Sequence, residues 1–276
     1  MSDALPGLRF LGHSTVRVEL GGRVVLTDPV LTRRVGGLTR VVDLPDPAHH
    51  SGVDLVLLSH LHGDHLHLPS LRMLGGRTGG GPRVVVPRGA GEWLRSKGID
   101  DVVELGIGEV LRDGDLRVTA LPAAHSGHRW GPRFTHGPQA PAVGHLLEAD
   151  DGRVYVAGDT DLHPVMDTLG DLDVALLPVW GWGPTLGPGH LDPDRAAHAV
   201  ERLRPRLAVP VHWGTLALPG LVRAPGGAGA RMRRLLVEPP RQFASAVAAD
   251  GGPRGWPWSN RVAGCERARA VPRRPH

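Results

Sequence analysis

A short stretch near residue 60 places four potential metal ligands directly after an apolar segment. Residues 54–59 (DLVLLS) are largely apolar, which predicts a strand buried on both faces. His60, His62, Asp64 and His65 follow at once. In an extended chain the first two point the same way, and a turn at the glycine between the pairs aims the other two at a neighbouring point. Imidazole and carboxylate groups at this density predict a site for Zn²⁺, Mn²⁺ or Fe at a strand end.

Three later strand candidates also end in a potential ligand. The apolar segments 118–122, 154–158 and 207–211 lead to His125, Asp159 and His212. Each is a weak signal alone, because His and Asp often stand at strand ends. Together with the first cluster they supply three ligands for each of two adjacent metal ions and one carboxylate to share. His67 falls outside this spacing, and we interpret it as a residue at the start of a helix.

The hydrophobic pattern predicts one domain of alternating strands and helices over residues 1–250. Strands are expected at 8–11, 15–20, 23–27, 54–59, 83–86, 116–121, 143–148, 153–157, 173–178 and 207–211. Helices are expected at 69–74, 90–97, 192–203, 231–237 and 241–249. Asp192 as N-cap and Pro193 at the first helical position mark one helix start. We expect two sheets with helices outside, and a basic Pro- and Arg-rich tail over 251–276.

The charge distribution argues against a nucleic-acid partner. The chain carries 32 Lys and Arg against 28 Asp and Glu, a net charge of +4. Six of the basic residues and one of the acidic residues lie in 251–276, so 26 basic groups face 27 acidic groups in the rest. We therefore expect a small-molecule substrate and no nucleic acid. The sequence leaves the oligomeric state open.

The single cysteine and the hydropathy profile bear on the compartment. Cys265 is the only cysteine, so the chain can form no internal disulfide and no thiolate metal cluster. No apolar run has the length of a membrane span, and residues 1–10 lack the basic start and apolar stretch of a signal peptide. These features predict a cytoplasmic protein.

The ligand pattern as a whole resembles the metallo-β-lactamase superfamily. The matching motifs are His60-x-His62-x-Asp64-His65, His125, Gly158-Asp159-Thr160 and Pro210-Val211-His212-Trp213-Gly214-Thr215. The flanking motifs resemble the branch that contains N-acyl-phosphatidylethanolamine phospholipase D and the L-ascorbate 6-phosphate lactonases. These motifs are Leu11-Gly12-His13-Ser14-Thr15, Leu26-Thr27-Asp28-Pro29 and His190-Leu191-Asp192-Pro193. The resemblance implies a four-layer αββα sandwich of two mixed sheets, with the site at one edge.

The resemblance also implies a role for each candidate residue. One metal ion would be held by His60, His62 and His125. The other would be held by Asp64, His65 and His212, with Asp159 as the bridging carboxylate. Asp28 and His13 are candidates for supporting the ligands from behind. Two divalent ions are expected, with Zn²⁺ the first choice and Mn²⁺ or Fe the alternatives.

The chemistry that follows is hydrolysis of an ester-type bond without a covalent enzyme intermediate. A hydroxide bridging two metal ions would attack a phosphodiester, a phosphorylated lactone or a lactone. Asp64 or Asp159 would accept its proton, and His190 would stabilise the oxyanion or protonate the leaving group. The alternatives are a di-iron oxidoreductase on the same fold and a non-catalytic binding module. A lipid substrate is a weaker option, because the sequence shows no strong amphipathic helix.

Residues outside the ligand set are candidates for substrate contacts. Trp180 and Trp182 stand in a glycine-rich stretch and are predicted to flank the pocket. Arg129 and Arg133 follow His125 and are candidates for receiving a phosphate group.

Overall fold

A computed structural model describes residues 5–75, 80–129 and 137–249. The first sheet has six strands in the order β1 (Gly7–Gly12), β2 (Thr15–Leu20), β3 (Arg23–Thr27), β6 (Leu55–Leu57), β7 (Arg83–Pro87) and β8 (Val102–Leu105). Its first three strands are antiparallel, and β3, β6, β7 and β8 run parallel. The basic tail 251–276, with Cys265, and Arg133 lie outside the described residues.

The second sheet repeats this mixed pattern. It has the order β14 (Leu207–Val211), β13 (Val174–Pro178), β12 (Gly152–Val156), β11 (Val143–Ala149), β10 (Leu116–Pro122) and β9 (Val110–Asp113). The strands β9 to β12 are antiparallel, and β12, β13 and β14 run parallel. A third, small sheet joins β15 (Leu216–Ala217), β5 (Leu38–Arg40) and β4 (Arg34–Val35).

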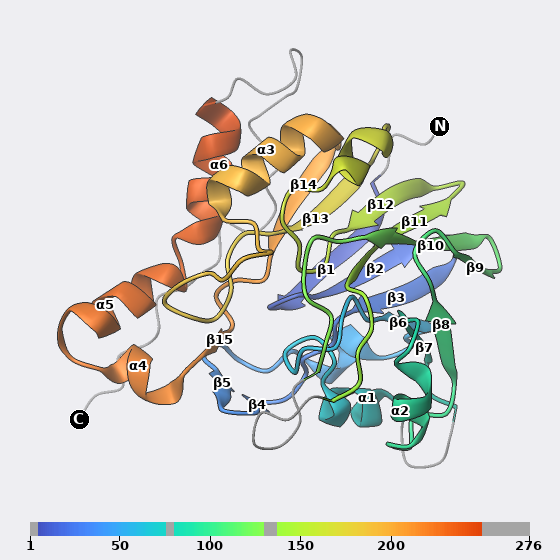
Figure 1. Cartoon of the computed structure of the whole chain (residues 1–276), viewed down its shortest axis with the longest axis horizontal. Coiled ribbons are helices and arrows are strands. Elements are labelled where there is room, and N and C mark those ends of the chain that lie inside the picture. The colour runs from blue at the N-terminus through green and yellow to red at the C-terminus, as the bar shows by residue number, and fades with distance from the viewer. Residues whose placement is uncertain (1–4, 76–79, 130–136, 250–276) are drawn as a thin grey trace.

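Helices cover the outer face of each large sheet. The helices α1 (Leu68–Gly75) and α2 (Gly91–Arg95) lie on one side, and α3 (Pro193–Leu203) and α6 (Pro239–Ala249) lie on the other (Figure 1). The remaining helical segments are η1 (Pro47–His50), η3 (Pro164–Thr168), α4 (Pro219–Arg223) and α5 (Gly226–Leu235). The predicted αββα sandwich of two mixed sheets is confirmed.

The core has three layers, which explains why the strands are so apolar. One buried cluster fills the space between the two sheets, where Val18, Leu57 and Val118 meet Val154 and Val209. A second cluster lies between the second sheet and the helices α3 and α6, and a third lies between the first sheet and the helices α1 and α2. The central strands are therefore buried on both faces, as their continuous apolar runs indicate.

The start of α3 follows its sequence signals closely. Asp192 is the N-cap, and its side chain accepts a hydrogen bond from the backbone N–H of Arg195 at 2.8 Å. Pro193 occupies the first turn, and Ala196 and Val200 are buried on the face that packs on the sheet. His190, one of the candidate site residues, lies two positions ahead of this cap.

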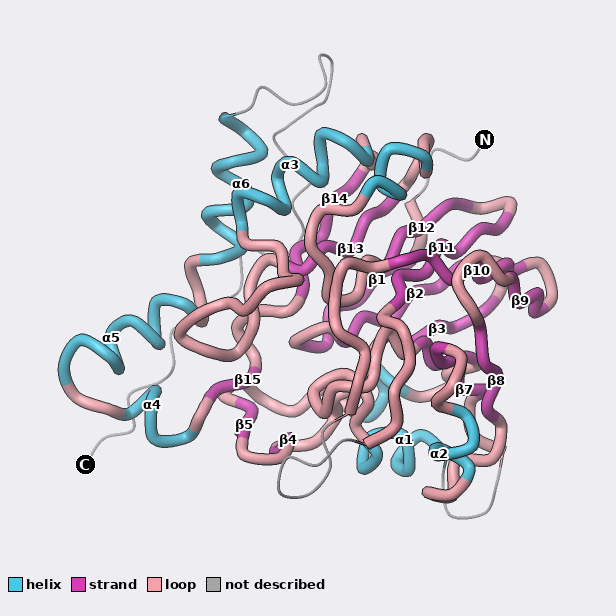
Figure 2. Tube along the Cα trace, in the orientation of Figure 1, coloured by secondary structure: helices cyan, strands magenta, loops and turns pink. Residues whose placement is uncertain are grey.

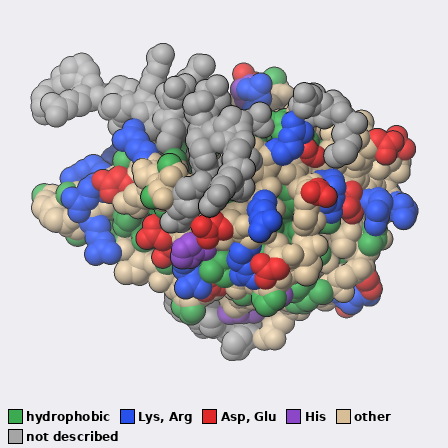
Figure 3. Space-filling view, turned by 90° about the horizontal axis from the view of Figure 1, so that it is seen from above, with side chains coloured by type: hydrophobic (Ala, Val, Ile, Leu, Met, Phe, Trp, Pro, Cys, Tyr) green, Lys and Arg blue, Asp and Glu red, His purple; other side chains and the backbone are tan. Residues whose placement is uncertain are grey.

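The molecular surface and helix lengths complete the description. Basic and acidic side chains are interspersed on the face shown in Figure 3. None of the helices in the described part of the chain has the length and apolar character that a membrane span requires.

Candidate metal centre

The candidate ligands lie at the carboxyl ends of strands from both sheets. His60, His62, Asp64 and His65 belong to the loop after β6, and His125 belongs to the loop after β10. Asp159 follows β12 and His212 follows β14. Figure 2, in which loops are pink, shows long loops meeting between the second sheet and α1. The structure thus brings all seven predicted ligands into one cluster.

The first donor group consists of His60, His62 and His125. Its inward-facing atoms are His60 Nε2, His62 Nδ1 and His125 Nε2. His62 Nδ1 lies 2.9 Å from His60 Nε2 and 3.2 Å from His125 Nε2. Zinc–nitrogen bonds of about 2.0–2.1 Å in a tetrahedral site place the ligand nitrogens roughly 3.3 Å apart. The three imidazoles therefore fit one divalent cation.

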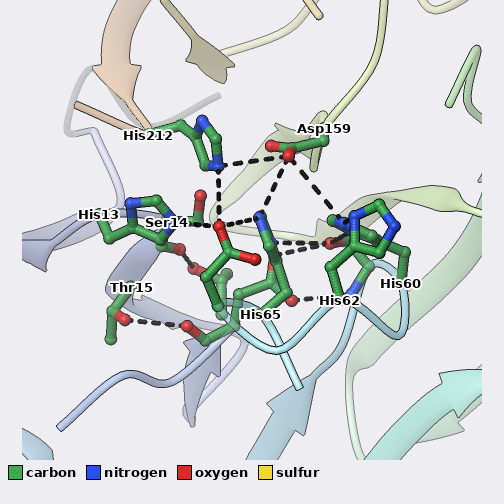
Figure 4. Close-up of polar contacts among 12 residues, drawn as sticks. His13, Ser14, Thr15, His60, His62, His65, Asp159 and His212 are labelled. Atoms are coloured by element: carbon green, nitrogen blue, oxygen red, sulfur yellow. Dashed lines mark hydrogen bonds and ion pairs between the residues drawn. The ribbon is translucent and has the colours of Figure 1, made fainter. Parts of the chain in front are cut away.

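The second donor group consists of Asp64, His65 and His212. Asp64 Oδ2 lies 3.9 Å from His65 Nε2 and 3.6 Å from His212 Nε2. Asp159 faces both groups, because its Oδ2 lies 3.2 Å from His65 Nε2, 3.2 Å from His212 Nε2 and 3.9 Å from His60 Nε2 (Figure 4). This is the position of a carboxylate shared between two cations.

Four of the five candidate imidazole ligands are held from behind through the outer nitrogen. His125 Nδ1 donates to Gly189 O at 2.8 Å, and His212 Nδ1 donates to Trp180 O at 2.5 Å. His65 Nδ1 donates to Asp28 Oδ2 at 2.8 Å. A proton on the outer nitrogen leaves the inner nitrogen with a free lone pair, which is the form that binds a metal.

Asp28 supports two ligands at once, because it also binds Ser59. The backbone N–H of Ser59 donates to Asp28 Oδ1 at 2.8 Å, and its hydroxyl donates to Asp28 Oδ2 at 2.7 Å. The same hydroxyl lies 3.0 Å from His60 Nδ1. One carboxylate therefore orients both His60 and His65.

The inner face of the cluster contains buried polar atoms that no described residue satisfies. These atoms are His65 Nε2, His212 Nε2 and Asp159 Oδ1. Buried polar atoms are normally paired, so lone pairs that converge in this way need a ligand. The nitrogen and carboxylate donors fit divalent zinc, manganese or iron. The residues present therefore fit two cations in the predicted grouping.

The carboxylates and imidazoles of the cluster shift each other's pKa values when no cation is present. Burial opposes a charge on His65, but the carboxylates of Asp159, Asp28 and Asp64 outweigh it and raise its pKa well above the usual value. Burial also opposes ionisation of Asp159, yet His212 and His65 hold the pKa of that carboxyl well below its usual range. Since a cation replaces protons at such a site, metal binding releases them.

His190 lies at the rim of the cluster. Its Nε2 is 3.4 Å from Asp159 Oδ2, and its side chain is 20% exposed. Its Nδ1 donates to Gly187 O at 3.1 Å, and its ring meets the His125 ring edge-on at 4.6 Å. Burial lowers the pKa of His190, but the hydrogen bond and charge of Asp159 outweigh it and raise the pKa above the ordinary value. A partly exposed imidazole beside the candidate ligands can meet a substrate.

His13 is part of the cluster, although it stands far from the ligands in sequence. Its Nε2 lies 3.0 Å from Asp64 Oδ2, and its ring centroid lies 4.2 Å from that of His212. Its side chain is fully buried. Figure 4 shows it on the same side of the cluster as His212. The Gly12-His13 pair in the turn between β1 and β2 is the sequence signal for this residue.

Three further candidates from the sequence, Arg129, His67 and Trp182, are not among the predicted ligands. The guanidinium of Arg129 is directed at Leu61 O and Leu66 O, so it is not turned toward a substrate phosphate. His67 contacts Ser70 Oγ at 2.8 Å just before α1, as expected of a helix-start residue. Trp182 is 37% exposed in the loop after β13, so its role beside the pocket stays a prediction.

The sequence gives no signal for the backbone acceptors in the loop between β13 and α3. The carbonyls of Trp180 and Gly189 hold the outer nitrogens of His212 and His125. A backbone carbonyl has no side-chain signature, so only its position after folding identifies it.

An αββα sandwich with a His and Asp cluster at its strand ends defines a protein of the metallo-β-lactamase fold. The chain belongs to the β-lactamase superfamily: the family model described as "Beta-lactamase superfamily domain" matches residues 23–213. The matched region runs from β3 to the residue after His212, so it contains every predicted metal ligand.

Relatives with known names point to the same class. The chain is 34% identical over 213 residues to a UPF0173 metal-dependent hydrolase of Methanopyrus kandleri, covering 75% of this chain and 84% of that protein. It is 29% identical over 236 residues to an N-acyl-phosphatidylethanolamine-hydrolyzing phospholipase D of Caenorhabditis elegans, covering 75% of this chain and 63% of that protein. The protein is therefore a metal-dependent hydrolase.

Solved structures confirm the fold. A metallo hydrolase of Ignicoccus hospitalis has a TM-score of 0.63 at 23% identity, covering 90% of this chain and 92% of that chain. The diiron beta-hydroxylase CmlA of Streptomyces venezuelae has a TM-score of 0.60 at 22% identity, covering 91% of this chain and 52% of that chain. Identities this low show a shared fold. They do not show which reaction this chain catalyses, so the reaction has to be inferred from the site.

Proposed function

We propose that this protein hydrolyses an ester-type bond in a small-molecule substrate at a dinuclear metal site. The observation that carries the proposal is the position of Asp159. Its Oδ2 lies 3.2 Å from both His65 Nε2 and His212 Nε2 and 3.9 Å from His60 Nε2, between two donor groups of three residues. His60, His62 and His125 would hold one ion, and Asp64, His65 and His212 would hold the other. Zn²⁺ suits these donors best, with Mn²⁺ or Fe as alternatives.

Two divalent cations supply an activated water at neutral pH and polarise the oxygen of the bond to be cleaved. The chain's own carboxylates accept the proton of that water. Asp64 and Asp159 are the candidates, because both lie in the cluster and Asp159 Oδ1 has no hydrogen-bond partner among the described residues. Their low pKa values keep both carboxyl groups ionised at neutral pH.

His190 completes the proposed machinery on the exposed side. Its Nε2 approaches the cluster while Gly187 O fixes its other nitrogen. Asp159 raises the pKa of His190, so the imidazole can carry a proton for a leaving group or donate a hydrogen bond to a developing oxyanion.

The bond is proposed to be a phosphodiester, a phosphorylated lactone or a lactone. The nematode relative supports the phosphodiester, since a phospholipase D hydrolyses one, although this chain spans 63% of that protein. We place the reaction in the cytoplasm, and a membrane-lipid substrate is the less supported choice.

The test combines metal analysis with a substrate panel. Purified protein is expected to hold two equivalents of a divalent metal and to hydrolyse at least one phosphodiester or lactone. His60→Ala should lose metal and activity together, whereas His198→Ala, an exposed histidine on α3, should lose neither. A wild-type protein that holds no more than one equivalent, or a His60→Ala variant of full activity, contradicts the proposal.

A further inference from the structure

We propose that Arg129 is a positioning residue that joins the two halves of the first donor group before metal binds. This inference rests on the ligand set proposed above. His60 and His62 come from the loop after β6 in the first sheet, and His125 comes from the loop after β10 in the second. The first metal site therefore spans two sheets, and something other than the metal must hold its halves together.

The guanidinium of Arg129 spans the four-residue turn that carries the ligands. Its Nη1 donates to Leu61 O at 3.0 Å and to Leu66 O at 2.9 Å. His62, Asp64 and His65 lie between these two carbonyls. Leu61 and Leu66 are fully buried, so their carbonyl groups need protein partners. One nitrogen thus closes both ends of the ligand-bearing turn.

The backbone of Arg129 is anchored on the other side of this junction. Its N–H donates to Pro138 O at 3.0 Å, and its carbonyl accepts from the N–H of Gly137 at 2.7 Å. These bonds pair two arms of the connection between β10 and β11, and His125 stands in the first arm, four residues before Arg129. The residue therefore connects the segment of His125 to the segment of His60 and His62 through a single side chain.

The surroundings of the guanidinium show that it serves these carbonyls and not an ion pair. No carboxylate among the described residues forms a salt bridge with Arg129. Its guanidinium carbon lies 5.0 Å from the centre of the Trp93 ring on α2. Burial lowers the pKa of Arg129, as expected for a cation without a counter-ion. A planar group stacked on an aromatic ring is fixed in direction, which suits it to hold a turn.

The expected consequence is weaker metal binding when the guanidinium is removed. The first site should lose most, because both His62 and His125 belong to segments that Arg129 holds. Groups that orient ligands without touching the metal typically change metal affinity by about 10–100-fold. Arg129→Met keeps an unbranched apolar stem but has no donor. Arg129→Lys keeps one donor nitrogen on a flexible stem, so its loss should fall between those of Arg129→Met and the wild type.

The experiment is a Co²⁺ titration of the metal-free full-length protein, followed by visible absorption. His125→Ala and His212→Ala serve as references, because each removes a ligand from one group only. The binding phase of the Co²⁺ titration that disappears in His125→Ala should be the one that Arg129→Met weakens. Its affinity should fall by about 10–100-fold, and excess Co²⁺ should restore the absorption spectrum. Arg202→Met is the matched control, since its guanidinium pairs with Asp167 away from the site.

Each outcome decides the inference. An Arg129→Met titration that superimposes on the wild type overturns it, as does a selective loss of the phase assigned by His212→Ala. If Arg129→Met does not fold, Arg129→Lys carries the test, and an unchanged affinity in that variant also overturns it. If His125→Ala and His212→Ala each still bind two equivalents of Co²⁺, the proposed ligand set itself is refuted. A failure of the proposed function can therefore be distinguished from a failure of the inference about Arg129.

Discussion

The backbone N–H of His212 donates to the carbonyl oxygen of His13 at 2.8 Å, and both residues have left-handed backbone, with φ of 61° and 55°. Such conformations are unfavourable for residues other than glycine and cost roughly 1–3 kcal/mol each. Thr215 Oγ1 accepts the N–H of His13 at 2.6 Å and helps to hold the pair. The strained backbone directs the side chain of His13 toward Asp64 and the side chain of His212 toward the inner face of the cluster.

The bond from His13 to Asp64 predicts the effect of His13→Asn. Asparagine tolerates a left-handed backbone, so the turn should keep its shape while the 3.0 Å contact with Asp64 Oδ2 is lost. We expect metal affinity to fall about 10-fold or more in competition with a chromophoric chelator. Asp171→Asn is the control, because Asp171 is exposed and also left-handed, with φ of 40°. Unchanged affinity in His13→Asn would show that Asp64 needs no such support.

Asp28→Asn should damage the site while preserving the backbone. Asp28 has φ of 34°, which asparagine accepts, but a neutral amide no longer attracts the Nδ1–H of His65 as a carboxylate does. We expect metal affinity to fall about 10–100-fold, with little change in the far-UV circular dichroism spectrum. Asp46→Asn, at the exposed N-cap of η1, should bind metal as the wild type does. Equal affinities in the two variants would argue against the role of Asp28.

His190→Ala should separate chemistry from metal binding. Because His190 lies at the rim and is not in the proposed ligand set, the variant should keep two metal equivalents. We expect kcat to fall by about 10²–10³-fold. If His190 protonates the leaving group, the loss should shrink for substrates with acidic leaving groups. A loss that is the same across a leaving-group series indicates oxyanion stabilisation, and full activity excludes both roles.

Removal of metal should lower the thermal stability of the protein. The inner atoms of His65, His212 and Asp159 then converge without a partner. Free metal at 100 times its dissociation constant should add about 2.7 kcal/mol per bound ion to the free energy of unfolding. Differential scanning calorimetry with and without a chelator measures this change. The gain should be absent in Asp159→Asn and present in His198→Ala; an identical gain in both would place the stabilising metal elsewhere.

His145 should make stability depend on pH independently of the metal ligands. It lies on β11, facing the core between the sheets with Val143 and Leu147, and is 1% exposed. Neither ring nitrogen has a partner among the described residues. Burial lowers its pKa from 6.5 to about 4, against the opposing charge of Asp28. Its folded form therefore resists protonation.

The sign of the effect follows from the direction of that shift. Between pH 4 and 6.5 the unfolded chain binds the proton and the folded chain does not, so the free energy of unfolding rises with pH across this window. The shift corresponds to about 3 kcal/mol, lost as the pH falls toward 4. Urea titrations should show a steeper rise of the free energy of unfolding with pH in the wild type than in His145→Leu. Other buried histidines with lowered pKa values, such as His13 and His67, contribute equally to both proteins. Equal slopes would mean that His145 is protonated in the folded protein.

The central strands and the ligand positions were predictable because both are local patterns. The strands β2, β3 and β14 have the bounds expected from their apolar runs. The ligands follow strand ends, where a parallel arrangement gathers side chains at one edge of a sheet. By contrast, β4, β5 and β15 are two or three residues long and were not predicted. Their pairing of Leu216 with Arg40 is set by contacts between distant segments.

From hydrophobic periodicity the sequence by itself predicted two sheets with helices outside, and its motifs resembled a family whose fold is a four-layer sandwich. It also determined the seven candidate ligands, because each follows an apolar segment. Only the tertiary structure decided which nitrogen of each imidazole faces inward. That choice depends on Asp28, Gly189 O and Trp180 O, which reach the ligands through packing. The same holds for Arg129: its two acceptor carbonyls become neighbours of its guanidinium only when the loops of the two sheets meet.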